Sequence, residues 1–233
     1  MRLELLKTLN AERAARRAAI LVTDVASGEQ RLVKGADIAS DAMAEELDAA
    51  LRMGKSRSIE VGGRSYFLTV QAPPARIICI GAVHISQALA PMAKLSDFDL
   101  TIIDPRTAFA TPERFPDVRL LAEWPQEVLP DLRLDRYTAV CLLTHDPKID
   151  DPALIAALRA ECFYIGALGS RKTHAKRVER MMAEGFSEAD LKRIHAPIGL
   201  DIGSVSPAEI AVSVLGEIIA ALRKKPLRTE PKA

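Results

Sequence analysis

The sequence predicts an α/β protein, in which a Rossmann-like doubly wound parallel sheet with strand order 3-2-1-4-5 follows a small α+β domain. Three observations lead to this prediction. Apolar strand-length segments alternate with helical segments from residue 76 onward, which is typical of βαβ units and a parallel sheet. The first of these strands, Ile77-Ile78-Cys79-Ile80, is apolar at every position, as expected for a sheet covered on both faces. Just before it, Pro73-Pro74 interrupts a strand-like stretch and marks a domain boundary.

The first domain, residues 1–74, combines helix and strand patterns. Met43, Leu47 and Leu51 recur every fourth residue, which predicts one buried helix face. Gly62-Gly63 separates two strand-like segments and predicts a β-hairpin. The expected strands are 19–23, 31–33, 58–61 and 65–70, and a further helix is expected at 3–18.

The second domain, residues 75–223, carries the predicted parallel sheet. The final helix has a clear start, because Ser206-Pro207-Ala208-Glu209 combines a capping box with proline at the first helical position. Residues 224–233, basic and containing prolines, are expected to form a flexible tail. Strands are expected at 76–80, 100–104, 118–121, 139–144 and 163–167, and helices at 84–94, 151–161 and 170–184.

The composition narrows the classes of partner. A formal net charge of +1 over 233 residues gives no general reason to expect a nucleic-acid or membrane surface. Cys79, Cys141 and Cys162 lie in or beside apolar runs without CxxC spacing, so we expect buried hydrophobes rather than zinc or redox ligands. The N-terminus does not resemble a signal peptide, and no apolar run approaches the roughly 18 residues of a membrane span. A cytoplasmic protein is expected.

The turn after the first strand of the sheet is a partial nucleotide motif. In GxGxxG the first glycine makes the turn and the second lets the backbone approach a pyrophosphate. Here the segment reads Gly81-Ala82-Val83-His84-Ile85-Ser86, which keeps only the first glycine and disfavours a standard NAD site. Asp104 ends the second strand about where a ribose-binding acid is expected, although Asp104-Pro105 is equally typical of a turn.

Polar residues also follow the fourth and fifth strands, at the edge where open α/β sheets bind ligands. His145 and Asp146 have the chemistry of acids, bases or ligand contacts, or they merely open a turn at Asp146-Pro147. Gly169, Ser170 and Arg171, with Lys172, either hold a phosphate at a helix start or form a solvated basic face.

A glycine-punctuated loop precedes the final helix. It runs from His195 to Gly203 and includes Gly199 and Asp201. Loops of this kind often carry function, but they also simply wrap a domain. The residues alone leave both interpretations open.

Together, four segments closely resemble the C-terminal domain of the XdhC family of accessory factors for xanthine dehydrogenase and related molybdenum hydroxylases. They are Leu142 to Asp146, Tyr164 to Arg171, Pro197 to Gly203, and Pro207 to Ala211. The resemblance covers residues 75–223. It implies a chaperone that binds the molybdenum cofactor, protects it while its terminal sulfur ligand is installed, and delivers it to the apo-enzyme.

The chain departs from the family pattern in two places. The family's first turn usually reads GxGHxG; His84 matches its histidine, whereas Val83 and Ser86 replace its last two glycines. The family's N-terminal domain usually carries GSSPR-like and GGCVE-like segments, and residues 1–74 contain neither. The first domain is either a reduced version of the family's domain or a replacement for it.

The leading functional hypothesis is therefore a molybdenum cofactor binding and insertion chaperone rather than an enzyme. The resemblance implies an apo molybdenum hydroxylase as partner, with a cysteine desulfurase as a further expectation. A homodimer is also expected, because domains of this size commonly pair. The cofactor is expected with or without a nucleotide, and neither a catalytic residue nor a metal ligand is identified. The alternatives are an NAD(P)-dependent oxidoreductase and a scaffold homologue that binds no cofactor. The candidate cofactor-binding residues are Gly81, His84, Asp104, His145, Asp146, Gly169, Ser170, Arg171, Gly199 and Asp201.

Overall fold

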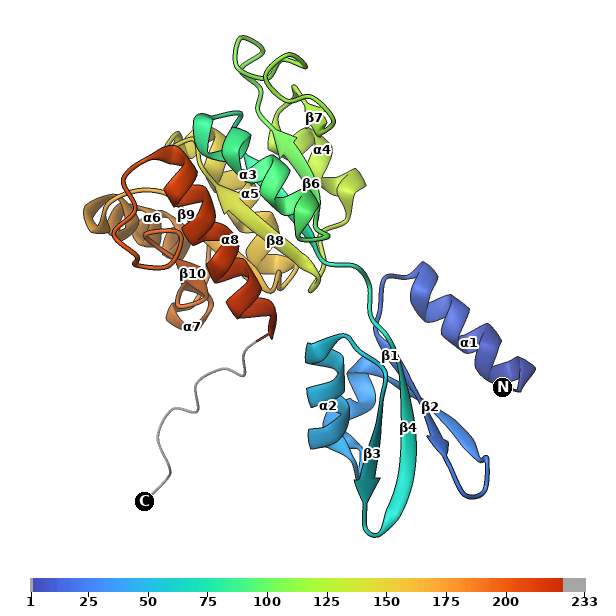
Figure 1. The fold of residues 1–233 in the computed structure, drawn as a ribbon. Coiled ribbons are helices and arrows are strands. Elements are labelled where there is room, and N and C mark those ends of the chain that lie inside the picture. Colours follow the sequence, from blue (N-terminus) through green and yellow to red (C-terminus); the bar gives the residue numbers. More distant parts are fainter. Residues whose placement is uncertain (1, 224–233) are drawn as a thin grey trace. The chain divides into compact units, whose positions relative to one another are not determined.

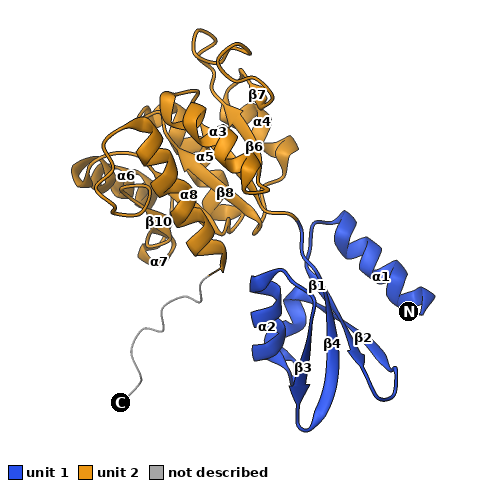
Figure 2. Cartoon of the chain, viewed as in Figure 1, with its two compact units in different colours: residues 1–73 blue, residues 74–233 orange. Residues whose placement is uncertain are grey.

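The computed structural model describes residues 2–223 and divides the chain into two compact units, residues 1–73 and 74–233 (Figure 2). The predicted tail at 224–233 lies outside the described residues. Each unit has a hydrophobic core built from its own residues, one in the first unit and two in the second. None of the helices between residues 2 and 223 is long and apolar enough to cross a membrane.

The first unit is a four-stranded antiparallel sheet in the order β2-β1-β4-β3. The predicted hairpin forms around Gly62 and Gly63, which both have positive φ angles of 58° and 74° that favour glycine. Leu47 on α2 and Leu68 on β4 are fully buried in the core of this unit. Its elements are α1 (Leu3–Ala14), β1 (Ala19–Asp24), β2 (Gln30–Lys34), η1 (Gly35–Ser40), α2 (Ala44–Met53), β3 (Arg57–Val61) and β4 (Arg64–Gln71).

The second unit contains a six-stranded sheet in which every pair of neighbouring strands is parallel. Counted along this unit, the spatial order is 3-2-1-4-5-6, so the predicted order is confirmed with one short strand added. The order reverses between β5 and β8, which is where open α/β sheets form their ligand crevice. The strands are β5 (Arg76–Ile80), β6 (Asp99–Ile103), β7 (Arg119–Leu121), β8 (Thr138–Leu142), β9 (Tyr164–Ala167) and β10 (Ile194–His195).

Helices cover both faces of this sheet (Figure 1). Alternate strand residues point to opposite faces, so Cys79 packs in the core with α3 and α8, while Ile78 and Ile80 pack in the core with α4 and α5. This two-sided burial explains why the central strands are apolar throughout. The helices are α3 (His84–Leu95), α4 (Pro125–Leu132), α5 (Pro147–Arg159), α6 (Arg171–Ala183), α7 (Glu188–Leu191) and α8 (Pro207–Arg223).

Several predicted bounds differ from the structure for local reasons. The first helix ends at Ala14 rather than residue 18, because Arg16 adopts a positive φ of 51° that turns the chain into β1. Helix α5 begins at Pro147, four residues earlier than predicted, because the Asp146 side chain caps it and proline suits its first position. The pattern of the sequence does not predict four elements: η1, α4, α7 and β10.

Candidate functional site

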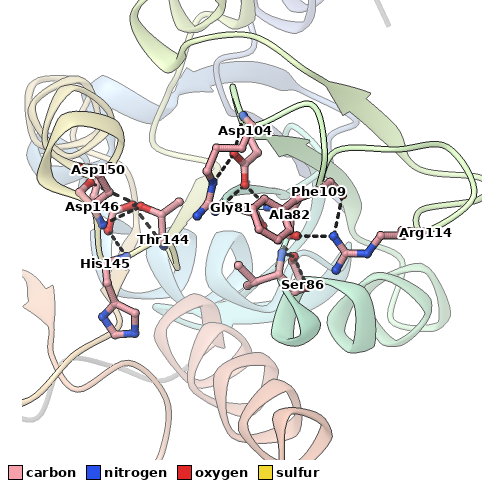
Figure 3. A network of polar contacts seen from close by, with 12 residues as sticks. Gly81, Ala82, Ser86, Asp104, Phe109, Arg114, Thr144, His145, Asp146 and Asp150 are labelled. Atoms are coloured by element: carbon pink, nitrogen blue, oxygen red, sulfur yellow. Dashed lines mark hydrogen bonds and ion pairs between the residues drawn. The ribbon is translucent and has the colours of Figure 1, made fainter.

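The candidate residues lie mainly on loops that leave the carboxyl ends of β5, β6, β8 and β9. Parallel strands bring these loops to one edge of the sheet, where Rossmann-type domains bind ligands. Figure 3 shows two polar groups along this edge, one around Gly81 and Asp104 and the other around Thr144 and Asp150.

The Gly81 turn is closed by hydrogen bonds within the protein. Gly81 has φ of 123°, and a Cβ there would come within 3.0 Å of Thr144 Cγ2, so the position requires glycine. The Ala82 N–H donates to Asp104 Oδ2 at 2.7 Å, and the Val83 N–H donates to Ser86 Oγ at 3.0 Å. The Ser86 hydroxyl in turn donates to the Gly81 carbonyl at 2.7 Å. Two amides that could face an anion in this turn are therefore already bonded.

Asp104 is fully buried, and both of its carboxylate oxygens are engaged (Figure 3). Arg106 donates its backbone N–H and Nε–H to Oδ1, each at 2.9 Å, and its Nη2 to Oδ2 at 2.7 Å. Burial acts to raise the pKa of Asp104, but the hydrogen bonds from Arg106 and Ala82 outweigh it and hold the pKa below its ordinary value. The carboxylate thus ties the end of β6 to the turn after β5.

Arg114 closes the same turn from the loop after β6. Its Nη1 donates to the Ala82 carbonyl at 3.1 Å and to the Phe109 carbonyl at 2.7 Å. The Arg106 guanidinium lies 4.9 Å from the centre of the Phe109 ring. Two arginines that the sequence analysis did not single out, Arg106 and Arg114, therefore hold this turn. His84, the first residue of α3, is exposed.

The second polar group is organised by Asp150 on α5. Asp150 Oδ1 accepts the Thr144 hydroxyl at 2.7 Å, and Oδ2 accepts the His145 N–H at 3.1 Å. Burial raises the pKa of Asp150 to about 6, against the opposing effect of these hydrogen bonds and of Arg177. His145 has a φ of 64° and is exposed, and Figure 3 shows its ring turned away from Asp150. Asp146 caps α5 by accepting the Lys148 N–H at 2.9 Å.

The segment after β9 approaches His145. Gly169 has φ of 131°, and a Cβ on it would lie 3.7 Å from His145 Nδ1. Ser170 is the N-cap of α6 and accepts the Thr173 N–H at 3.2 Å, while Arg171 is exposed. His145 and the helix face that begins at Lys172 line a common cavity of about 280 Å³.

The glycine-punctuated loop belongs to a separate network held by Glu217 on α8. Glu217 Oε2 accepts the Tyr164 hydroxyl at 2.6 Å and the Gly199 N–H at 2.8 Å, and Oε1 lies 2.9 Å from His195 Nδ1. Burial acts to raise the pKa of Glu217, but these hydrogen bonds lower it overall. Asp201, further along the loop, is exposed. The network fixes the loop against the sheet and α8.

The structure therefore brings together Gly81 with Asp104, and His145 with Gly169, while Gly199 lies in the Glu217 network. Within residues 2–223, no group of three or more His, Cys, Asp or Glu side chains is placed to hold a metal ion. Sequence reasoning missed the five charged residues that organise these groups. Of these, only Arg106 could have been suspected from the local sequence, because it follows Asp104 by two residues in a turn. They are Arg106, Arg114, Asp150, Arg177 and Glu217.

The chain is similar in sequence to a known family and to several proteins. Residues 77–218 match the family model described as the XdhC Rossmann domain. Over 146 residues, 63% of this chain, the sequence is 32% identical to the molybdenum cofactor insertion chaperone PaoD of Escherichia coli. It is 30% identical to a probable xanthine dehydrogenase subunit of Bacillus subtilis over 65% of the chain, and 31% identical to the uncharacterized protein YqeB of Escherichia coli over 71%.

A solved structure shares the fold. A crystal structure of a xanthine dehydrogenase from Bacillus halodurans matches 94% of this chain and 67% of its own, with a TM-score of 0.66 and 21% identity. The chain spans less than half the length of the curated relatives it matches, 40% of PaoD, 44% of the Bacillus subtilis protein and 30% of YqeB.

Proposed function

The chain belongs to the XdhC family, and from this premise we propose that it binds the molybdenum cofactor and inserts it into a xanthine dehydrogenase-type molybdenum hydroxylase. The relative named as a molybdenum cofactor insertion chaperone and the relative named as part of a probable xanthine dehydrogenase support this proposal. Fold alone would not, because Rossmann-like domains serve many functions.

One observation of the site carries the proposal further: the ligand edge of the sheet is kept, while the groups that would bind a dinucleotide bind one another. The Ala82 amide, which would face a pyrophosphate, donates to Asp104, and the Asp104 carboxylate, which would face a ribose, is buried under Arg106. Binding NAD(P) in the standard way would require this hydrogen-bonded turn to open, at the cost of buried polar groups. The edge therefore suits a different ligand.

The groups still available at this edge fit the organic part of the molybdenum cofactor. His145 and Asp146 are exposed, and a ring nitrogen or carboxylate there can pair with the hydrogen-bonding edge of a pterin. The helix start at Gly169 and Ser170 offers amides and a positive dipole to the pterin's phosphate. His84, Arg171 and Asp201 are exposed and complete the proposed contacts, whereas Gly81, Asp104 and Gly199 hold the surrounding backbone. When bound, the cofactor supplies the metal centre that the target enzyme uses.

Partners follow from the same proposal. The recipient is an apo molybdenum hydroxylase, and a cysteine desulfurase is the proposed source of the cofactor's sulfur. A homodimer and a cytoplasmic location complete the proposal. The two partner enzymes follow from family membership, and the homodimer from the tendency of domains of this size to pair.

Insertion is tested by reconstitution. Apo-xanthine dehydrogenase is mixed with molybdenum cofactor in the presence of this chain, of its His145→Gln variant, or of Lys192→Gln as an exposed control at the end of α7. We expect the wild type and the control to raise the yield of active enzyme. We expect His145→Gln to raise it less, because the variant's affinity for the cofactor should be about tenfold lower, the effect of one lost hydrogen bond.

Two further measurements distinguish the alternative functions. Recovery of the apo-enzyme in a pull-down without any cofactor binding would identify a scaffold. Tight NADPH binding by fluorescence with cofactor-dependent turnover would identify an oxidoreductase. Either result would overturn the proposal.

A further inference from the structure

A cavity of about 280 Å³ lies at the carboxyl ends of β8 and β9, between α5 and α6. Its volume is slightly below the range of about 300–1,000 Å³ for small-molecule sites. The cavity therefore suits a small anion or one end of a larger ligand. Its lining residues are His145, Pro147, Asp150, Asp151, Lys172, Thr173, Lys176, Arg177 and Arg180.

Arg177 is the unusual member of this lining. It is only 2% exposed, and its Nη2 donates to the Leu168 carbonyl at 3.1 Å. Its Nε and Nη1 are buried and have no hydrogen-bond partner among the described residues. Burial lowers the pKa of Arg177, against the attraction of Asp150 and Asp151, which reflects the cost of holding the guanidinium away from water. Two unpaired donors on a buried cation are a costly arrangement that an anionic acceptor would relieve.

The remaining charges of the cavity favour an anion. Lys172, Thr173, Lys176, Arg177 and Arg180 recur at helical spacing, which places them on the α6 face that borders the cavity. Lys172 and Lys176 are exposed and form no ion pair within the part of the chain that the structure describes. Among the lysine, arginine and aspartate side chains of the lining, four cations face two carboxylates, an excess of two positive charges.

Both carboxylates of the lining accept hydrogen bonds from the protein, which reduces their repulsion of a bound anion. Asp151 is held by Arg180, whose Nε and Nη2 donate to it at 2.5 and 2.9 Å. Asp150 directs its oxygens to Thr144 and to the His145 N–H at the end of β8. The negative charge of Asp150 partly balances the buried charge of Arg177. The Nε and Nη1 donors of Arg177 nevertheless have no acceptor among the described residues.

We propose that this cavity binds the phosphate group of a small phosphorylated ligand, with Arg177, Lys172 and Lys176 as its cationic contacts. An arginine fork and lysines are the side chains that proteins use for this group, and the start of α6 adds the favourable end of a helix dipole. The site depends on the proposed function only for the identity of the ligand. If that function holds, the bound group is the phosphate of the molybdenum cofactor, and a nucleotide is the alternative source.

The proposal is tested by calorimetric titration of the whole chain with inorganic pyrophosphate. The test variant is the double substitution Lys172→Gln with Lys176→Gln, because both side chains are exposed and their loss does not threaten the fold. Its matched control is Lys94→Gln with Lys192→Gln, two exposed lysines near the ends of α3 and α7 that remove the same charge. We expect the double test variant to weaken pyrophosphate binding at least about tenfold, and the control to change it less than about threefold.

The contact between Arg177 and the anion can be observed directly by nuclear magnetic resonance. In a ¹H–¹⁵N spectrum of the wild type, the Arg177 Nε–H signal, assigned by its loss in Arg177→Gln, should shift on addition of pyrophosphate. A purely structural arginine would not respond. No binding of pyrophosphate by the wild type, equal weakening by both double variants, or an unmoved Nε–H signal would each overturn the proposed site.

Two further titrations separate the site from the function. If the chain retains molybdenum cofactor but the Lys172 and Lys176 substitutions leave its affinity unchanged, the cavity does not hold the cofactor's phosphate, while the function stands. If pyrophosphate binds as predicted and the cofactor does not, the site stands and the function is wrong. Competition of pyrophosphate by molybdenum cofactor but not by NADPH supports the cofactor's phosphate as the source, and the reverse supports a nucleotide.

Discussion

Asp104 occupies the position where a dinucleotide-binding domain places its ribose-binding acid, yet it serves the protein's own backbone. Its carboxylate accepts the Ala82 N–H and three N–H groups of Arg106. The residue that the sequence marks as a candidate ligand contact therefore holds the turn after β5 in place. Arg106 shares this work, since its backbone and side chain close the turn that Asp104-Pro105 opens.

Removing the charge of Asp104 should destabilise the second unit. Asp104→Asn places an amide against the Arg106 guanidinium and weakens several hydrogen bonds to a buried group. We expect a loss of about 2 kcal/mol in the free energy of unfolding, measured by urea denaturation. Asp146→Asn is the matched control, because asparagine caps α5 about as well as aspartate and should change the stability little. Equal stability of the two variants would contradict the assigned role.

Asp150 should make stability depend on pH. Its folded-state pKa of about 6 exceeds its ordinary value of 3.8, so the folded protein holds this proton more tightly than the unfolded chain does. The free energy of unfolding should therefore fall by about 3 kcal/mol as the pH rises from about 4 through 6. Other groups titrate in the same range, so the measurement is the difference between the wild type and Asp150→Asn. A difference that is constant between pH 4 and 7 would contradict this prediction.

Among the elements, helix α8 holds in place the loop that precedes it in the chain. Glu217, in the C-terminal half of α8, collects hydrogen bonds from Tyr164 on β9 and from the Gly199 N–H. Gly199 has φ of 93°, and a Cβ on it would lie 2.3 Å from Ser213 Oγ. The loop, β9 and α8 therefore form one packed unit.

Two glycines of this loop provide a matched pair of substitutions. Gly199→Ala adds strain at a positive φ and a clash with α8, whereas Gly203→Ala, at φ of 72°, meets no atom within 4 Å. We expect Gly203→Ala to cost about 1 kcal/mol and Gly199→Ala about 1–3 kcal/mol more. Thermal or urea unfolding of both variants measures the difference, and equal losses would show that the loop does not pack against α8.

The elements that could be predicted from the sequence are those with a continuous or periodic apolar pattern. The bounds of the strand beginning at Arg76 agree with the prediction, since every following residue is apolar and buried. Helix α4 escapes prediction because it is only eight residues long and has Pro130 in its interior, and β10 because two residues carry no pattern. The edge holding His145 and Gly169 follows from strand order, but Arg177 and Glu217 could not be found, because their roles arise only when distant elements pack.

At the scale of the whole molecule, the chain is two units with separate cores. The core of the first unit runs from Ile20 to Val70, and both cores of the second lie between Ala75 and Leu222. The proposed contacts for the cofactor and for phosphate all lie in the second unit. Binding is therefore expected to belong to that unit alone.

This expectation can be tested with a fragment. Residues 74–223 expressed alone should unfold cooperatively in urea and bind pyrophosphate with the affinity of the full chain, within about threefold. Residues 1–73 expressed alone should show no pyrophosphate binding. A second unit that is unfolded without residues 1–73, or that folds and has lost the affinity, would contradict the independence of the two units.

The proposed function requires that this chain hold the molybdenum cofactor. The most direct test is the amount of molybdenum and of pterin that elutes with the purified 233-residue chain in gel filtration, after incubation with the cofactor. Molybdenum is measured by mass spectrometry and pterin by the fluorescence of its oxidised form. We expect stoichiometric amounts of both, reduced in His145→Gln and unchanged in Lys192→Gln. Protein that emerges without molybdenum and pterin, while remaining folded, would contradict it.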